Sequence, residues 1–221
     1  MPRNSNKAII WDMDGVIANT APHHLKAWQE AFSKKRVKFT EEDFRESFGL
    51  RNDTIIRKVL GEEVSQDEID IIASEKEESF RRKIKQGLKP LPGVIKLLES
   101  LSEHGFRMAL ASSAPIENIQ LLTEGLGIDK FFQVIVSEKD VTEGKPSPQG
   151  FLLAAERLRI KPDNCIVIED AIVGVTAARR AAMRCLAVTN THPETSLREA
   201  DLIVNSLEEV TVNDLAKLLS L

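Results

Sequence analysis

Short apolar runs with little polar alternation recur along this chain, and they constrain its fold more than any other feature. Stretches with helical spacing separate most of these runs, and strand–helix–strand repeats predict right-handed crossovers. Strands of this kind are typical of a sheet that is covered on both faces. We therefore predict an α/β fold, a Rossmann-like parallel sheet with helices on both faces. The predicted strands are residues 7–11, 107–111, 134–136, 165–169, 185–189 and 202–204.

One long segment interrupts this alternation. Between the first two predicted strands the sequence contains no convincing strand, and its apolar spacing predicts several consecutive helices. Thr40 and Asp43 have the spacing of a capping box, which would begin one of these helices. We therefore expect an inserted α-helical cap domain at residues 19–90, and an α/β core formed by residues 1–18 and 91–221.

Charge and composition narrow the classes of partner. The chain has 221 residues, of which 42% are hydrophobic and 29% charged, and its net charge is −4. This balance is typical of a globular protein and offers no broad basic surface to nucleic acid. No apolar run reaches the roughly 18 residues of a membrane span, and the stretch before the first carboxylate is too short for a signal peptide. Both cysteines lie in apolar runs, so we expect buried thiols in a cytoplasmic protein without a membrane partner.

Polar side chains stand where the predicted strands end. In open parallel sheets, ligands bind outside the carboxyl ends of the strands. The polar residues at these ends are therefore predicted to converge on one site. They are Asp12 and Asp14 after the first strand, Ser112 and Ser113 after the second, Lys145 beyond the third, and Glu169 and Asp170 at the fourth.

The carboxylates in this set would repel one another, and a buried carboxylate is costly unless it is paired or bound to a metal. A hard divalent cation would relieve the repulsion, and Mg²⁺ often joins a few carboxylates to a substrate phosphate. With a metal and Lys145 nearby, a carboxylate stays ionised and can attack phosphorus to form an aspartyl-phosphate. Lys145, Ser112 and backbone N–H groups of residues 12–16 would bind the phosphoryl oxygens. Asp14 would protonate the leaving oxygen and then deprotonate the attacking water or hydroxyl.

Four motifs, in this order, resemble the haloacid dehalogenase superfamily in its phosphotransferase branch with a helical cap. They are DMDGV at 12–16, ALASS at 109–113, GKPSP at 144–148 and IEDAIVG at 168–174. Their order and spacing fit the family along nearly the whole chain. Within the branch, the chain looks most like the β-phosphoglucomutase-like sugar-phosphate enzymes.

The resemblance implies roles for the acidic residues. Asp12 would be the nucleophile and Asp14 the general acid and base. Mg²⁺ would be held by Asp12, the backbone carbonyl of Asp14 and Asp170, with Glu169 beside it. Taken alone, Asp170 could be a helix N-cap, but the preceding Glu169 and the companion motifs favour a metal role.

The resemblance also implies which residues bind phosphate and substrate. Ser112 and Lys145 would hold the transferred phosphate, while Ser113 is the weaker candidate because one serine of the pair can instead cap the next helix. In the cap, Thr20, His24 and Trp28 stand where the subgroup carries a hinge threonine, a histidine and a tryptophan, and Lys76 matches a cap lysine. Lys76 is the exception in a run, 76–85, that we otherwise interpret as a solvated helix face.

Two departures from the subgroup concern a second phosphate. The mutases have an arginine in the loop after the cap glycine, whereas here Arg51 stands one place earlier and Asn52 occupies the matching position. They also tend to have Ser-Lys-Asn after the second motif, where residues 114–116 are Ala-Pro-Ile. Arg51 stays a candidate phosphate ligand, but both departures favour a plain phosphatase.

The predicted function is that of a Mg²⁺-dependent phosphomonoester hydrolase, which acts on a small phosphorylated metabolite, a sugar phosphate, through an aspartyl-phosphate on Asp12. The alternative is a mutase of the β-phosphoglucomutase type, in which a second hydroxyl accepts the phosphoryl group. A dehalogenase would need no metal and would have little use for Asp14, and a non-catalytic relative would have lost part of the constellation. Because the cap would cover the site within one chain, we expect a monomer.

Overall fold

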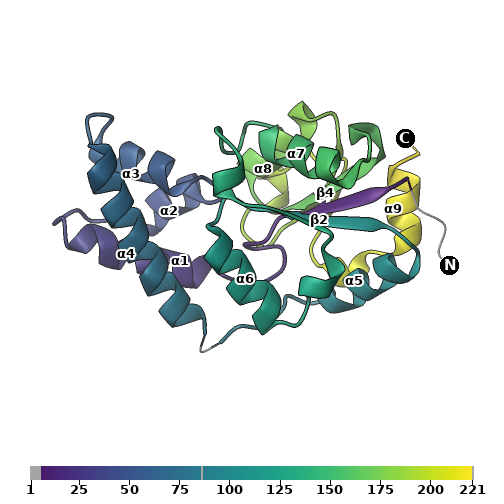
Figure 1. The fold of residues 1–221 in the computed structure, drawn as a ribbon, viewed down its shortest axis with the longest axis horizontal. Coiled ribbons are helices and arrows are strands. Elements are labelled where there is room, and N and C mark those ends of the chain that lie inside the picture. The colour runs from purple at the N-terminus through teal and green to yellow at the C-terminus, as the bar shows by residue number, and fades with distance from the viewer. Residues whose placement is uncertain (1–5, 86, 221) are drawn as a thin grey trace.

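The computed structural model describes residues 6–85 and 87–220 and contains the predicted parallel sheet (Figure 1). Its strands follow the order β3-β2-β1-β4-β5-β6, and every neighbouring pair is parallel. The six predicted strands are confirmed, the first beginning one residue later than expected and the fifth beginning and ending one residue earlier. The strands are β1 (Ala8–Trp11), β2 (Arg107–Ala111), β3 (Val134–Val136), β4 (Cys165–Glu169), β5 (Arg184–Val188) and β6 (Leu202–Val204).

Helices occupy the stretches between the strands, and five of the described helices lie between β1 and β2. None of the helices within the described ranges combines the length and the apolar character that crossing a membrane requires. The helices are α1 (Ala21–Ser33), α2 (Glu41–Ser47), α3 (Asn52–Leu60), α4 (Gln66–Ile84), α5 (Val94–Glu103), α6 (Ile116–Gly125), α7 (Gln149–Leu158), α8 (Ile172–Arg180) and α9 (Val212–Leu218).

The sheet is covered on both faces, which explains why its strands lack polar alternation. All five residues of β4 are buried. Since successive side chains of a strand point to opposite faces, Ile166 and Ile168 pack with α5, α6 and α9, whereas Cys165 and Val167 pack with α7 and α8. The two helical layers lie on either side of the sheet in Figure 1. The predicted Rossmann-like core is therefore confirmed.

Helices α1–α4 form the predicted cap, which lies at the end of the molecule away from the chain termini (Figure 1). The cap has its own apolar core, in which Trp28 stacks on Phe32 with 5.2 Å between ring centroids. Thr40 begins α2 with the predicted capping box, because its hydroxyl accepts from the Asp43 N–H and the Asp43 carboxylate accepts from the Thr40 N–H. The boundaries at 19 and 90 stay predictions, and residues 1–5, 86 and 221 of the predicted domains lie outside the described residues.

The strand order places the predicted site. Strand β1 lies at the centre of the sheet, and the chain continues to β2 on one side and to β4 on the other. Such a reversal of strand order is a topological switch point, where the carboxyl ends of the strands leave room for a ligand. The residues that follow β1, β2 and β4 therefore lie at the same edge, which faces the cap (Figure 1).

Candidate active site

Three buried carboxyl groups meet at the carboxyl ends of β1 and β4. Asp12 follows β1, Glu169 ends β4, and Asp170 comes next. The parallel register aligns Trp11 with Ile168, and the Asp12 N–H donates to the Ile168 carbonyl oxygen at 2.9 Å. The three residues each offer one carboxyl oxygen, and these oxygens lie within 4.8 Å of one another. The sheet itself thus forces the acidic groups together.

Lys145 is the cation that faces this cluster. Its Nζ lies 2.5 Å from Oε1 of Glu169 and also donates to Oδ1 of Asp12. Burial alone would lower the pKa of Lys145, but Asp12 and Glu169 outweigh burial and raise it, so the side chain is charged. Burial is the largest cause that raises the pKa of Asp12 to about 8, with Lys145 opposing the rise. Burial and then Glu169 likewise raise the pKa of Asp170 well above its usual value, so the cluster can accommodate further positive charge.

The cluster has the ligand chemistry that Mg²⁺ requires. Both carboxyl oxygens of Asp170 are buried without a hydrogen-bond partner among the residues described. Oε2 of Glu169, by contrast, accepts from the N–H groups of Asp170 and Ala171 at 2.8 and 2.9 Å. A buried oxygen without a partner is costly, and carboxylate oxygens are the ligands that Mg²⁺ prefers. The residues present therefore fit an ion held by Asp12 and Asp170, which would stabilise the charge of a bound phosphate. The alternative role of Asp170 as a helix cap is not seen, because Ala171 is the N-cap residue of α8 and no side chain caps it.

Two glycines leave the carboxyl groups the space they need. Gly15 has a φ of +79°, and a Cβ atom there would lie 1.9 Å from Oδ2 of Asp170. Gly174 lies in α8, where a Cβ atom would be 1.7 Å from Oε1 of Glu169. Any larger residue at either position would displace one of the clustered carboxyl groups, and at Gly15 it would also strain the backbone.

Asp14 pairs with a histidine of the cap. Its Oδ1 lies 3.1 Å from Nε2 of His24, and both side chains are largely buried. Burial alone would raise the pKa of Asp14, but His24, followed by Thr20 and Lys76, together outweigh it and hold the pKa below the usual value. The His24 ring stacks on Phe80 of α4 at a centroid distance of 3.8 Å, which fixes its orientation. Helix α1 therefore brings a polar ring to the second carboxylate of the first motif.

The two serines after β2 have different partners. The hydroxyl of Ser112 accepts from the Ala114 N–H at 3.1 Å, and its own proton is available to a ligand. The hydroxyl of Ser113 donates to the carbonyl oxygen of Gly49 at 2.9 Å, so it joins the core to the cap. Thr20 is buried at the residue before α1. Of the two serines, Ser112 therefore keeps its hydroxyl proton for a ligand, and its role in binding phosphate stays a prediction.

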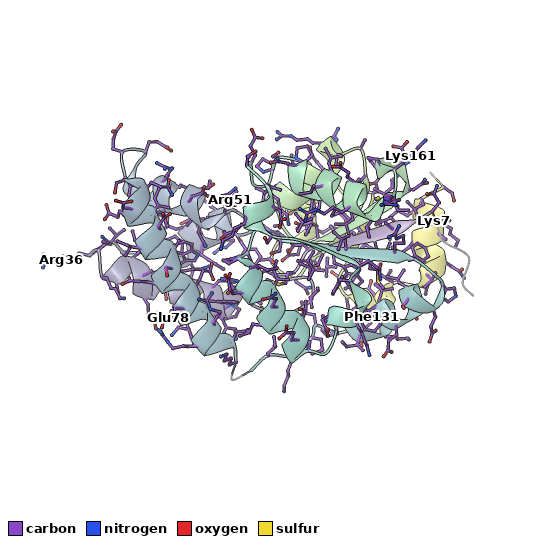
Figure 2. All side chains as sticks on the ribbon, in the orientation of Figure 1. Lys7, Arg36, Arg51, Glu78, Phe131 and Lys161 are labelled. Carbon is purple, nitrogen blue, oxygen red and sulfur yellow. The ribbon has the colours of Figure 1, made fainter. Side chains whose placement is uncertain are left out.

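Arg51 packs against the loop that carries Lys145, at the boundary between cap and core (Figure 2). Its Nη1 donates to the carbonyl oxygens of Val141 and Thr142 at 3.2 and 3.3 Å. A Cβ atom at Gly144 would lie 2.6 Å from its Cδ. Arg51 lines a neighbouring cavity together with Lys145, but it does not border the cavity that holds Asp12 and Asp14.

A cavity lies between the carboxyl ends of the strands and the cap. Its walls combine the acids of the first motif and both serines with polar and aromatic residues of the cap. The lining residues are Asp12, Asp14, His24, Trp28, Phe44, Ser47, Phe48, Gly49, Leu50, Asn52, Ile55, Lys76, Glu77, Ser112, Ser113 and Ala114.

A family model described as haloacid dehalogenase-like hydrolase matches residues 9–188, which is more than half of the chain. The chain belongs to the haloacid dehalogenase-like hydrolase family. The resemblance of the four motifs to that superfamily is thereby confirmed. The match also covers the cap, so it spans the whole cavity of this hydrolase.

Several proteins similar to this hydrolase are named for their action on phosphate esters. It is 34% identical over 170 residues, 77% of its chain, to the chloroplastic 5-amino-6-(5-phospho-D-ribitylamino)uracil phosphatase of Arabidopsis thaliana, but spans only 46% of that protein's length. It is 33% identical over 178 residues to the fructose-1-phosphate phosphatase YqaB of Escherichia coli, covering 79% of this chain and 92% of that one. Among solved structures, a β-phosphoglucomutase from Clostridium difficile is similar with a TM-score of 0.90 and 27% identity, over 97% of each chain.

Sequence reasoning missed several residues that complete the site of this hydrolase. The Asn190 side chain donates to the carbonyl oxygen of Gly15 at 2.8 Å, and Nδ1 of His192 lies 3.2 Å from the carbonyl oxygen of Asp170. Both follow β5 at the same edge of the sheet, so the polar run after the fifth predicted strand was the signal that would have found them. The interpretation of 76–85 as a solvated face was wrong for four buried residues, which are Glu77, Ser79, Phe80 and Ile84. Glu77 is 4% exposed and lines the cavity.

Proposed function

We propose that this hydrolase is a Mg²⁺-dependent phosphomonoesterase that acts on a small phosphorylated metabolite, a sugar phosphate, through an aspartyl-phosphate on Asp12. The observation that carries the proposal is the buried cluster of Asp12, Glu169 and Asp170 beside the ammonium group of Lys145. The named activities of the two phosphatase relatives support the same class of substrate.

In the first step, a carboxylate oxygen of Asp12 attacks phosphorus while the bond from phosphorus to the leaving oxygen breaks. A Mg²⁺ ion held by Asp12 and Asp170, with Glu169 beside it, would supply charge stabilisation to the phosphoryl oxygens. The ammonium group of Lys145 and the hydroxyl of Ser112 donate to the same oxygens, which carry most of the charge in the transition state.

Asp14 and His24 together act as the general acid and base in this mechanism. Their 3.1 Å contact places a proton-sharing pair in the cavity wall beside Asp12. The pair gives its proton to the leaving oxygen in the first step. In the second step it accepts a proton from the water that attacks the aspartyl-phosphate, so that inorganic phosphate leaves and Asp12 is regenerated.

The charges of the cavity favour water over a second sugar hydroxyl as the phosphoryl acceptor. A mutase has to hold a second phosphate group at the cap side of the cavity. Among the described residues that line it, Lys76 is the single lysine or arginine, and its Nζ is paired with Oε1 of Glu77 at 2.6 Å. Arg51 is bound to backbone carbonyl oxygens instead. The mutase alternative draws on Thr20, His24 and Lys76 and on the similarity to β-phosphoglucomutase.

Product analysis distinguishes these functions. The protein would be incubated with Mg²⁺ and a mixture of sugar phosphates that includes β-glucose 1-phosphate, and followed by phosphorus NMR. A growing inorganic phosphate signal is the expected result, and the ester that disappears identifies the substrate. Conversion of one ester into another with little free phosphate would instead establish the mutase.

The proton role of the Asp14–His24 pair predicts the effect of removing the imidazole. His24→Asn is expected to lower kcat by about 10²-fold, the lower range for a general acid or base, because Asp14 then loses its partner. The neighbouring His23, which is half-buried on the same helix and does not line the cavity, provides the matched control His23→Asn. Steady-state kinetics on the identified ester would measure both variants, and equal kcat values in them would refute the assignment.

A further inference from the structure

A buried polar network lies in the cap wall of the cavity. Oε1 of Glu77 accepts from Nδ2 of Asn52 at 2.8 Å and from Nζ of Lys76 at 2.6 Å. Nζ of Lys76 also donates to Oδ1 of Asn52 at 3.3 Å. The three residues are buried, with exposed fractions of 3% for Lys76, 4% for Glu77 and 8% for Asn52, and all three line the cavity. The three residues therefore bind one another, and the charges of Lys76 and Glu77 cancel.

The other oxygen of Glu77 connects this wall to the core. Oε2 accepts from Nδ2 of Asn118 at 2.6 Å, and Oδ1 of Asn118 accepts from Arg81 at 3.0 Å. Asn118 belongs to α6 of the core, whereas Glu77 and Arg81 belong to α4 of the cap. Glu77 is thus held from two sides and cannot turn away from Lys76 without breaking the contact between cap and core.

Opposite charges and aromatic contacts stabilise the pair formed by Lys76 and Glu77. Burial alone would raise the pKa of Glu77, but Lys76 and then His24 outweigh it and lower the pKa, so the carboxylate is ionised. The ammonium group of Lys76 lies over the rings of Trp28 and Phe80, 4.9 and 5.8 Å from their centroids. Because the carboxylate of Glu77 already neutralises Lys76, the ammonium group attracts a second anion only weakly.

We propose that Glu77 is a specificity-determining residue, which restricts the cavity to monophosphates whose leaving group is uncharged and carries hydroxyl groups. This inference rests on the proposed function, since it concerns the leaving-group side of the same site. The oxygens of Glu77 and Asn52 and the ammonium group of Lys76 offer acceptors and donors to hydroxyl groups, while Phe44, Phe48 and other apolar residues line the rest of the cap wall. A second phosphate that approached the ammonium group of Lys76 would be repelled by the adjacent carboxylate of Glu77.

The test compares ligand binding before and after the charge of Glu77 is removed. Binding of fructose 1-phosphate and of fructose 1,6-bisphosphate would be measured by calorimetry with Mg²⁺, in the Asp12→Asn background, which prevents turnover. With Glu77 present, the bisphosphate is expected to bind no tighter than the monophosphate. Glu77→Gln is expected to improve binding of the bisphosphate relative to the monophosphate by about tenfold, because Lys76 regains a net charge. The adjacent Glu78, whose side chain is 69% exposed and pairs with Arg82, provides the control Glu78→Gln, which should leave the ratio unchanged.

The ratio separates specificity from structural support. If Glu77 only supports the cap structurally, Glu77→Gln will weaken the binding of both ligands equally. An unchanged ratio of the two affinities therefore overturns the inference. Absence of binding by both sugar phosphates overturns it as well. Should the single variant unfold, the double variant Glu77→Gln with Asn118→Asp restores an acceptor for the new amide, its added carboxylate being paired with Arg81. Failure of the proposed function would appear separately, as no phosphate release from any ester by the unmodified protein.

Discussion

Replacement of Asp12 by asparagine is expected to lower phosphate release by at least about 10³-fold, because the amide cannot form the acyl-phosphate on which the mechanism depends. Release of inorganic phosphate from the identified ester, with Mg²⁺ in excess, would measure the loss. The effect should be on kcat rather than on the affinity for the ester, since Lys145 and Ser112 still bind the phosphate. Asp163→Asn removes an exposed aspartate from the turn before β4 and should have no effect.

The fold of Asp12→Asn should be intact, which separates lost chemistry from lost structure. The pKa of Asp12 is raised from 3.8 to about 8, chiefly by burial. A carboxyl group whose pKa is raised by folding costs stability once pH rises above its unfolded value, and the cost grows until pH passes the folded value. Without metal at pH 8, the asparagine variant should therefore unfold at a temperature no lower than the wild type. Full activity in a folded variant would refute the nucleophilic role of Asp12.

Removal of Mg²⁺ is expected to have the second large effect, through Asp170. Chelation of divalent ions should abolish phosphate release, and Mg²⁺ should restore it. Because the ion binds the folded protein, Mg²⁺ at a hundredfold excess over its dissociation constant should stabilise the fold by about 2.7 kcal/mol. Thermal unfolding with and without Mg²⁺ would measure this as an increase of several degrees in Tm.

Asp170→Asn provides the matching variant. The buried oxygens of Asp170 have no hydrogen-bond partner among the described residues, so their loss removes the ligand without breaking another contact. The variant is expected to lose the Mg²⁺-dependent increase in Tm and to release phosphate at least about 10²-fold more slowly, since replacing even the outer-shell partners of a metal site costs about 10–100-fold. Asp163→Asn should keep the full increase in Tm. Unchanged activity after chelation, or the same Tm increase in Asp170→Asn, would refute the metal site.

Much of the fold followed from the sequence because its signals are local. A strand covered on both faces needs a continuous apolar run, and the six runs were therefore visible one by one. The long stretch without strands predicted the cap for the same reason. The contacts that join cap to core were not predictable in this way. Ser113 reaches Gly49, and Asn118 reaches Glu77, across separations of 64 and 41 residues.

The acidic end of the site was also accessible from sequence. Parallel strands bring their carboxyl ends to one edge, so Asp12, Glu169 and Asp170 had to be neighbours once β1 and β4 were paired. The cap wall of the cavity could not be predicted from the sequence. Arg51 was a candidate for phosphate from its place in the loop after the cap glycine, and its contacts with the carbonyl oxygens of Val141 and Thr142 depend on the packing of cap against core, which no local pattern predicts.

The sequence by itself determined the strands, the cap, the family motifs and the group of acids and lysine that would share one edge of the sheet. Only the tertiary structure decided which polar groups of the cap face that edge and what charge they carry there. Lys76 and Glu77 are adjacent in the chain, and their spacing alone does not distinguish an exposed pair from a buried one. Packing of α4 against α1, α3 and α6 removes both from water, and a buried charge must then take the nearest opposite charge as its partner.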